Sequence, residues 1–263
     1  MTFRLSWAFA LLLLVTGCST LPWQQASERI TFSSNPETLR GDLHLPEPGN
    51  GPTPAVVVVH GGSWQRRTGD MQAISRKLAA EGIAAFNITY RMAPEYTYPA
   101  AVDDVRDAID WLKRNAASYN IDPGRIGGWG YSAGGQLILR AGLDPRTGLK
   151  AIVSGGTPAS FSYWPESPII SRFIGSRYAV DPDTWEDASP VNHVHPDSPA
   201  VFLYHGEDDE LVEPVQMDFM ARALAAQGVP HQAHLVEGRG HIGAYLFNER
   251  SEAMAIDYLQ RWL

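Results

Sequence analysis

The pentapeptide Gly130-Tyr131-Ser132-Ala133-Gly134 places a serine between two glycines in the pattern G-x-S-x-G. A short apolar stretch ending at Ile126 precedes it, and a helix-like run over 135–143 follows it. A serine on a sharp strand-to-helix turn holds its Oγ clear of the backbone, and the N–H groups of the helix favour a negative oxygen nearby. This context favours a nucleophilic serine, although a plain Gly/Ser turn between two elements has the same letters.

Other polar groups that could complete this chemistry also follow apolar runs. The carboxyl ends of parallel strands share one edge of a sheet, and ligands bind there. We therefore expect a nucleophile, an acid, a base and a glycine-rich turn to meet at one edge. The three groups are His60-Gly61-Gly62-Ser63-Trp64, His205-Gly206-Glu207-Asp208-Asp209 and Gly238-Arg239-Gly240-His241.

Strands and helices are expected to alternate along most of the chain. The run 55–59 is rich in β-branched residues, which is typical of a strand buried on both faces of a parallel sheet. Repeated strand–helix–strand units predict an α/β fold, with a mostly parallel, doubly wound sheet and helices on both faces. We expect strands over 29–33, 39–45, 55–59, 83–88, 125–129, 151–153, 200–204 and 234–236, and helices over 71–81, 100–115, 135–143, 215–227 and 249–263.

Residues 155–199 interrupt this alternation, because they show no clear period. A long irregular segment within a compact domain is often a lid or a binding loop. Its aromatic side chains could form a wall of a substrate site or a small satellite core beneath the loop. These side chains are Phe161, Tyr163, Trp164, Phe173, Tyr178 and Trp185.

The length and charge of the chain exclude some classes of protein. A chain of 263 residues is long enough for one large domain or two small ones with a sizeable core. The net charge is −8 and no run of Lys or Arg occurs, so a nucleic-acid partner is not expected.

The N-terminal residues resemble a bacterial lipoprotein signal peptide. Leu5–Val15 is apolar apart from Ser6, but eleven helical residues span only about 16 Å, which is too short for a bilayer core. The sequence Val15-Thr16-Gly17-Cys18 resembles a lipobox, in which the cysteine is lipidated. An ordinary signal peptide with a chance cysteine is the alternative.

Cys18 is the only cysteine in the chain, so an exported protein would have no internal disulfide. We predict a signal peptide over 1–17, a lipid anchor at Cys18 and a tether over 18–27. Ser19 stands where an inner-membrane retention signal would resemble Asp, which predicts an outer-membrane anchor on the periplasmic or surface face.

Beyond these motifs, the chain resembles α/β-hydrolases of the esterase/lipase group from about 55 to 241. It is similar to feruloyl and acetyl-xylan esterases and to kynurenine formamidase-like members. The resemblance implies an α/β-hydrolase domain over 28–263, with 155–199 as a lid or binding segment. Ser63 replaces the third glycine of H-G-G-G, and Gln136 stands where many relatives have His. Further matching residues are Tyr90-Arg91-Met92-Ala93-Pro94-Glu95, Pro99-Ala100, Asp103-Asp104 and Ala188-Ser189-Pro190-Val191-Asn192-His193-Val194.

The resemblance also implies roles for the polar groups. Ser132 would be the nucleophile and His241 its base, since an imidazole can take and return a proton near neutral pH. The family pattern H-G-x-x-D selects Asp209 as the carboxylate that orients the base, with Asp208 and Glu207 as competitors.

An oxyanion hole is expected from the backbone N–H groups of Ala133, Gly62 and Ser63. His60 and His205 are expected to brace their loops. No metal-ligand grouping occurs among the histidines, and the chemistry requires no cofactor. For Trp64, pocket lining and core packing both remain open, as do a buried and a solvated position for Asp103 and Asp104.

We therefore expect a serine hydrolase that cleaves carboxylic esters of short or aryl acyl groups through an acyl-serine intermediate. The substrate would be a small-molecule or polymer-borne ester, and the lipid at Cys18 would attach the protein to a membrane. Two alternatives are an amide hydrolase, acting on an aryl formamide or a peptide, and a surface-anchored binding protein on an inactive hydrolase scaffold.

Overall fold

The computed structural model describes residues 27–263. The predicted signal peptide, the lipidation site Cys18 and the tether up to residue 26 lie outside the described residues. In the part that is described, no helix combines the length and the apolar character needed to cross a membrane.

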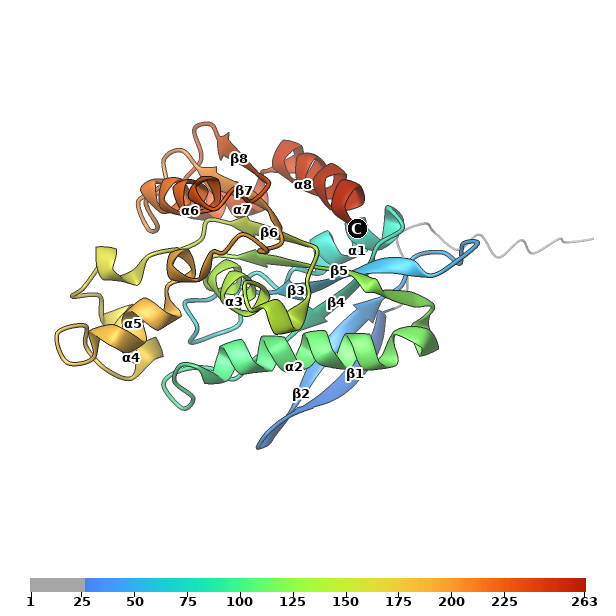
Figure 1. The fold of residues 1–263 in the computed structure, drawn as a ribbon, viewed down its shortest axis with the longest axis horizontal. Coiled ribbons are helices and arrows are strands. Elements are labelled where there is room, and N and C mark those ends of the chain that lie inside the picture. Colours follow the sequence, from blue (N-terminus) through green and yellow to red (C-terminus); the bar gives the residue numbers. More distant parts are fainter. Residues whose placement is uncertain (1–26) are drawn as a thin grey trace, which may run out of the picture.

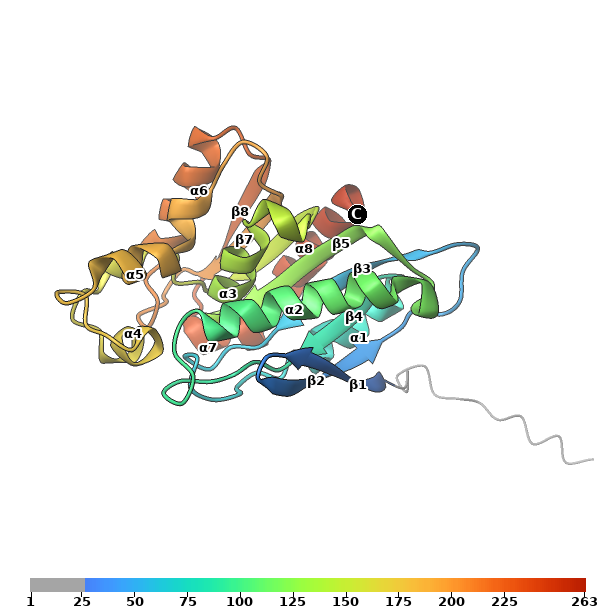
Figure 2. The same ribbon diagram turned by 60° about the horizontal axis from the view of Figure 1, so that its bottom comes forward.

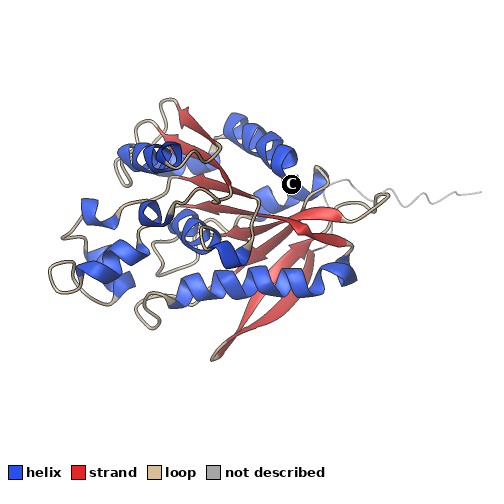
Figure 3. Cartoon of the chain, in the orientation of Figure 1, coloured by secondary structure: helices blue, strands red, loops and turns tan. Residues whose placement is uncertain are grey.

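One eight-stranded sheet forms the centre of the described chain, with the order β1-β2-β4-β3-β5-β6-β7-β8 (Figures 1 and 3). The first two strands run antiparallel, and all pairs from β4 to β8 are parallel. The mostly parallel sheet is therefore confirmed, with the expected antiparallel pair at one edge. The strands are β1 Ser27–Ser34, β2 Glu37–His44, β3 Thr53–Val59, β4 Ala84–Ile88, β5 Ile121–Tyr131, β6 Ala151–Gly155, β7 Ala200–Gly206 and β8 His231–Val236.

Helices cover both faces of this sheet, as a doubly wound fold requires (Figure 2). The buried side chains of α2, α3 and α6 join one core cluster, and those of α1 and α8 join the other. The helices are α1 Gln72–Ala80, α2 Ala100–Asn115, α3 Ala133–Gly142, α4 Pro168–Ile174, α5 Pro182–Ala188, α6 Val215–Ala226, α7 His241–Leu246 and α8 Glu249–Trp262.

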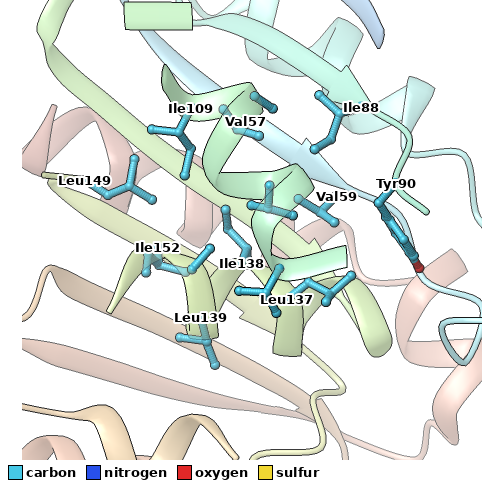
Figure 4. Close-up of a cluster of buried hydrophobic side chains, with 14 of the residues drawn as sticks. Val57, Val59, Ile88, Tyr90, Ile109, Leu137, Ile138, Leu139, Leu149 and Ile152 are labelled. Carbon is cyan, nitrogen blue, oxygen red and sulfur yellow. The ribbon is translucent and has the colours of Figure 1, made fainter. Parts of the chain in front are cut away.

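Strand β3 explains why the sequence here reads as a continuous apolar run. Val57 and Val59 pack into the core beneath α2 and α3, whereas Val56 and Val58 pack into the core on the opposite face. Side chains of a strand alternate between the two faces, so a central strand covered on both sides needs apolar residues at every position. Figure 4 shows the first of these clusters, where Leu137 and Ile138 of α3 lie close to Val59.

Several boundaries differ from the sequence prediction. Strand β5 begins at Ile121 rather than 125, because a register shift against β3 accommodates Pro123-Gly124. Strand β7 extends to Gly206, so His205 lies within the strand and not after it. Ser27, which was expected to end the tether, is the first residue of β1.

The segment 155–199 has more structure than its sequence pattern suggested. It contains α4 and α5, which both Figure 1 and Figure 2 show grouped at the left of the molecule. Each helix begins with a capping side chain followed by proline, at Ser167-Pro168 and Asp181-Pro182. This is a recognised start signal for a helix, but seven residues are too few to show a 3.6-residue period.

The aromatic side chains of this segment mainly extend the core. Phe161, Phe173 and Trp185 are fully buried in the same cluster as α2 and α3, whereas Tyr163 is exposed. Most of these aromatic residues therefore belong to the main core, and neither a separate satellite core nor a wall of a substrate site describes them.

A buried ion pair ties α2 to the antiparallel edge of the sheet. Asp104 is fully buried and accepts hydrogen bonds from Arg91 Nε at 2.8 Å, from the Arg91 backbone N–H at 2.6 Å and from Ser34 Oγ at 2.5 Å. Asp103 instead pairs with Arg106 at 2.8 Å and is half-exposed. Of the two neighbouring carboxylates, one is therefore structural and the other solvated.

We predict that Asp104→Asn lowers the free energy of unfolding by about 3 kcal/mol, because it removes the buried carboxylate that pairs with the Arg91 guanidinium. Asp103→Asn should change it by less than about 1 kcal/mol, since exposed ion pairs contribute little. Urea denaturation of both variants measures the difference. Equal effects would contradict the structural role of Asp104.

Candidate active site

Ser132 lies at the turn between β5 and α3, with backbone angles φ 55° and ψ −123°. This is a strained conformation for a residue with a side chain. The flanking glycines make it possible, because a Cβ at Gly130 would come within 2.2 Å of Gly134 O, and one at Gly134 within 2.2 Å of Val59 O. The strand–turn–helix context expected from the pentapeptide is present.

Ser132, His241 and Asp209 are joined by two consecutive hydrogen-bond contacts. His241 Nε2 lies 2.9 Å from Ser132 Oγ, and His241 Nδ1 lies 2.6 Å from Asp209 Oδ2. His241 is 8% exposed and Asp209 2%, so the contact between these two residues is buried, whereas the contact between His241 and Ser132 borders a cavity. The three residues come from the ends of β5, β7 and β8, at the same edge of the sheet.

Asp209 is held by more than the imidazole. Its Oδ1 accepts the backbone N–H groups of Leu211 at 3.0 Å and Val212 at 2.9 Å. His205 Nε2 donates to Val212 O and lies 3.3 Å from Asp209 Oδ2. Burial would raise the pKa of this carboxyl, but the hydrogen bonds from His205, His241 and Val212 outweigh burial and hold the pKa well below its usual range.

The two competing carboxylates do not reach the imidazole. Asp208 is exposed, and Glu207 is exposed and accepts the backbone N–H of Gly238 at 3.0 Å. Of the three acidic residues after β7, the geometry therefore selects Asp209.

His241 is the first residue of α7, and Gly240 precedes it as the N-cap. Tyr131 positions it, since its hydroxyl donates to His241 O at 2.6 Å and its ring packs 5.2 Å from the imidazole. This role was missed because Tyr131 is the variable residue in G-x-S-x-G, and the contact spans 110 residues of sequence.

The turn after β3 brings Gly62 and Ser63 beside Ser132, where all three line one cavity. Ser63 and Trp64 both have left-handed backbone angles, with φ 54° and 59°. The Ser63 N–H has no acceptor in the described part of the chain, and Ala133 as the first residue of α3 has no helical acceptor. Of the three N–H groups predicted to form an oxyanion hole, those of Ser63 and Ala133 therefore have no such acceptor, and Gly62 lies at the same turn.

The side chain of Trp64 fixes this strained turn. Its ring stacks on Phe173 at 4.6 Å, and its Nε1–H donates to Gln136 Oε1 at 2.9 Å. Gln136 is fully buried and donates in turn to Ala188 O at 2.8 Å. Trp64 thus combines core packing with pocket lining. Gln136 connects the turn, α3 and the segment 155–199, called the insertion below. Gln136 was noted in the sequence only as a departure from relatives.

Two cavities adjoin Ser132. One has a volume of about 170 Å³ and includes His241, Tyr131 and Tyr245. The other has a volume of about 120 Å³ and includes Ala133 of α3, Trp64 of the turn after β3 and Trp164 of the insertion. Trp164 is therefore the one aromatic residue of the insertion that lines either cavity at the serine.

His60 is buried and braces the turn. Its Nδ1–H donates to Gly61 O at 2.7 Å, and its ring stacks on Tyr90 at 4.4 Å. Burial is the largest influence on this imidazole and lowers its pKa to about 4, although the hydrogen bond to Gly61 opposes the change. No group of three or more potential metal ligands occurs among the residues that the structure describes.

Comparison with known proteins places these features in context. A family model described as BD-FAE matches residues 41–224. Esterase LipQ of Mycobacterium tuberculosis is 31% identical over 195 residues, which cover 66% of this chain and 46% of LipQ. The chain thus spans about half the length of that relative. A kynurenine formamidase of Meyerozyma guilliermondii is 28% identical over 211 residues, covering 73% of this chain and 77% of the formamidase.

Among solved structures, a truncated carbohydrate esterase from gut microbiota superimposes with a TM-score of 0.79 at 23% identity. The superposition covers 90% of this chain and 97% of the esterase. The fold predicted from the sequence, an α/β-hydrolase fold, is confirmed by this likeness.

The neutral, buried state of His60 predicts a pH-dependent stability. The ordinary pKa of this imidazole is 6.5, and the pKa in the folded chain is about 4. At a pH between these two values, the unfolded chain binds a proton at His60 that the folded chain does not bind. Stability is therefore lost as the pH falls through this window, by about 2 kcal/mol from His60 between pH 7 and pH 5. Urea denaturation at both pH values should show a smaller loss for His60→Asn than for the unmodified protein, and identical losses would contradict the assignment.

Proposed function

The chain belongs to the BD-FAE family of α/β-hydrolase esterases, and we propose that it hydrolyses carboxylic esters through an acyl-serine intermediate. The proposal rests above all on the line of hydrogen bonds from Ser132 through His241 to Asp209. A serine hydroxyl is a weak nucleophile until a base within hydrogen-bond reach removes its proton. Here the base has a carboxylate partner of its own.

In the acylation step, Ser132 Oγ attacks the ester carbonyl carbon while His241 Nε2 takes the hydroxyl proton. The Asp209 carboxylate holds His241 Nδ1–H, which keeps Nε2 free as the acceptor and stabilises the imidazolium that forms. Since the hydrogen bonds around Asp209 keep its pKa low, this carboxylate is ionised at neutral pH.

The carbonyl oxygen becomes an oxyanion, which the N–H groups of Ser63 and Ala133 would bind, with Gly62 at the same turn. Collapse of the tetrahedral intermediate breaks the bond to the alcohol oxygen, and that oxygen takes the proton from His241 Nε2. Water then attacks the acyl-serine by the same sequence, which releases the acid and restores Ser132.

Short or aryl acyl groups fit the proposal best. The cavity that includes Ala133 and Trp164 has a volume of only about 120 Å³ and is lined mainly by apolar side chains. The 28% identity to a kynurenine formamidase supports aryl formamides as a second substrate class. A panel of acetyl, butyryl and feruloyl esters, with N-formylkynurenine and a peptide amide, separates the two classes.

We predict that Ser132→Ala lowers the kcat for a short p-nitrophenyl ester by roughly 10⁴-fold or more, because the variant has no nucleophile. A fluorophosphonate probe should label the unmodified protein at Ser132 and leave the variant unlabelled. An unchanged thermal midpoint serves as the folding control. Failure of the unmodified protein to react with either reagent would favour the non-catalytic binding protein.

We further predict that Asp209→Asn lowers kcat by about 10³- to 10⁴-fold, because an amide favours the wrong tautomer of His241. Asp208→Asn is the matched control, since Asp208 is the adjacent residue, is exposed, and loses the same charge on substitution. Its kcat should stay within about twofold of the unmodified protein. A larger loss in Asp208→Asn would reverse the assignment of the orienting carboxylate.

A further inference from the structure

The two cavities at Ser132 can be assigned to the two halves of an ester, an inference that rests on the proposed function. The leaving alcohol oxygen must receive its proton from His241 Nε2, so the alcohol lies on the side of the imidazole. The cavity of about 170 Å³ contains His241, whereas the cavity of about 120 Å³ does not. The first is therefore the alcohol side and the second the acyl side.

These two sides differ in charge, although both are lined mainly by apolar surface. The acyl side is formed largely by apolar side chains, with Trp64, Trp164 and Ile170 among them. The residues of the alcohol side include Arg66 and no Asp or Glu, whereas the acyl side includes no charged residue. A neutral acyl group and an alcohol portion that carries an anionic group match this difference in charge.

The backbone at Arg66 is tied to the turn that carries the oxyanion donors. Gly62 O accepts the backbone N–H groups of Gln65 at 3.1 Å and of Arg66 at 3.2 Å. Gly61 and Thr68 close the loop with a bridge, and a Cβ at Gly62 would come within 1.8 Å of Arg66 O. The loop therefore presents Arg66 from a backbone position that is determined relative to Ser63.

The guanidinium of Arg66 is available for a ligand. Arg66 is exposed, and it forms no ion pair with any residue that the structure describes. The chain as a whole has a net charge of −8, so this cation is not part of a generally basic protein. A guanidinium binds a carboxylate through two parallel hydrogen bonds, which gives geometric selectivity as well as attraction.

We propose that the alcohol side of the site selects esters whose alcohol portion carries a carboxylate, and that Arg66 binds this carboxylate. The substrate class is thus the O-acyl esters of hydroxy acids. Arg66 acts on the choice of substrate and takes no part in the proton transfers at Ser132 and His241.

The neighbouring Arg67 offers a matched control. It is also exposed, but it lines a separate groove with Asp42 and Thr89 that does not include Ser132. Removal of either arginine changes the net charge equally. Only removal of Arg66 should affect the choice between charged and neutral alcohols.

The test compares 4-acetoxybenzoate with 4-acetoxybenzamide, which share an acetyl group and differ in the charge of the alcohol portion. Arg66→Gln should lower the ratio of kcat/KM for the acid over the amide by about two- to fivefold, the range for an exposed ion pair. Arg67→Gln should leave the ratio unchanged. In the unmodified protein, about 0.5 M NaCl should lower the ratio towards that of Arg66→Gln.

A third ester, p-nitrophenyl hemisuccinate, has its carboxylate on the acyl portion. A selective loss of this substrate in Arg66→Gln would overturn the assignment of the two sides. An equal loss for all three esters, or equal ratios in the two arginine variants, would overturn the role of Arg66. If the unmodified protein cleaves none of the esters, the proposed function itself fails, which is a separate outcome.

Discussion

The left-handed backbone at Ser132 is the constraint on which the site depends. A strained residue persists only where its surroundings hold it, and here β5, α3 and the carbonyl of Val59 close in on both flanking glycines. Val59 ends β3, the neighbour of β5, so the same contact brings the turn after β3 beside the serine. Ser132 and the turn that carries Gly62 and Ser63 are therefore located by one packing arrangement between two central strands.

The second strained segment needs support from outside the sheet. Ser63 and Trp64 hold left-handed angles without the freedom of glycine, and the Trp64 ring is clamped by Phe173 and Gln136. Phe173 belongs to α4, and Gln136 also binds Ala188 O at the end of α5. The segment 155–199 thus stabilises the turn that carries Ser63 and also lines the cavity of about 120 Å³ beside Ser132, while most of its aromatic residues face the core.

The sequence predicted those features that depend on local pattern or chain order. The β-branched run of β3 indicates a buried strand, and the spacing of apolar residues in α2 indicates an amphipathic helix. Because Ser132, Asp209 and His241 each follow a parallel strand, the sequence also predicts that they share one edge of the sheet. Contacts between distant segments could not be predicted in this way. The hydrogen bond from the Tyr131 hydroxyl to His241 O depends on how β5 packs against α7. The burial of Asp104 rather than Asp103 depends on how α2 packs against the sheet.

Buried and exposed charged residues at this site also differ in how much a substitution would disturb their surroundings. Asp209 is a buried charge that several hydrogen bonds stabilise, so a change at His205 or in the backbone around Val212 would raise its pKa and leave part of the buried charge uncompensated. Arg66 is exposed and its guanidinium forms no ion pair among the described residues, so its replacement leaves the hydrogen bonds at Ser132 intact. The proposed selectivity for the alcohol could therefore vary on the loop after β3 while the arrangement at the end of β5 stays the same.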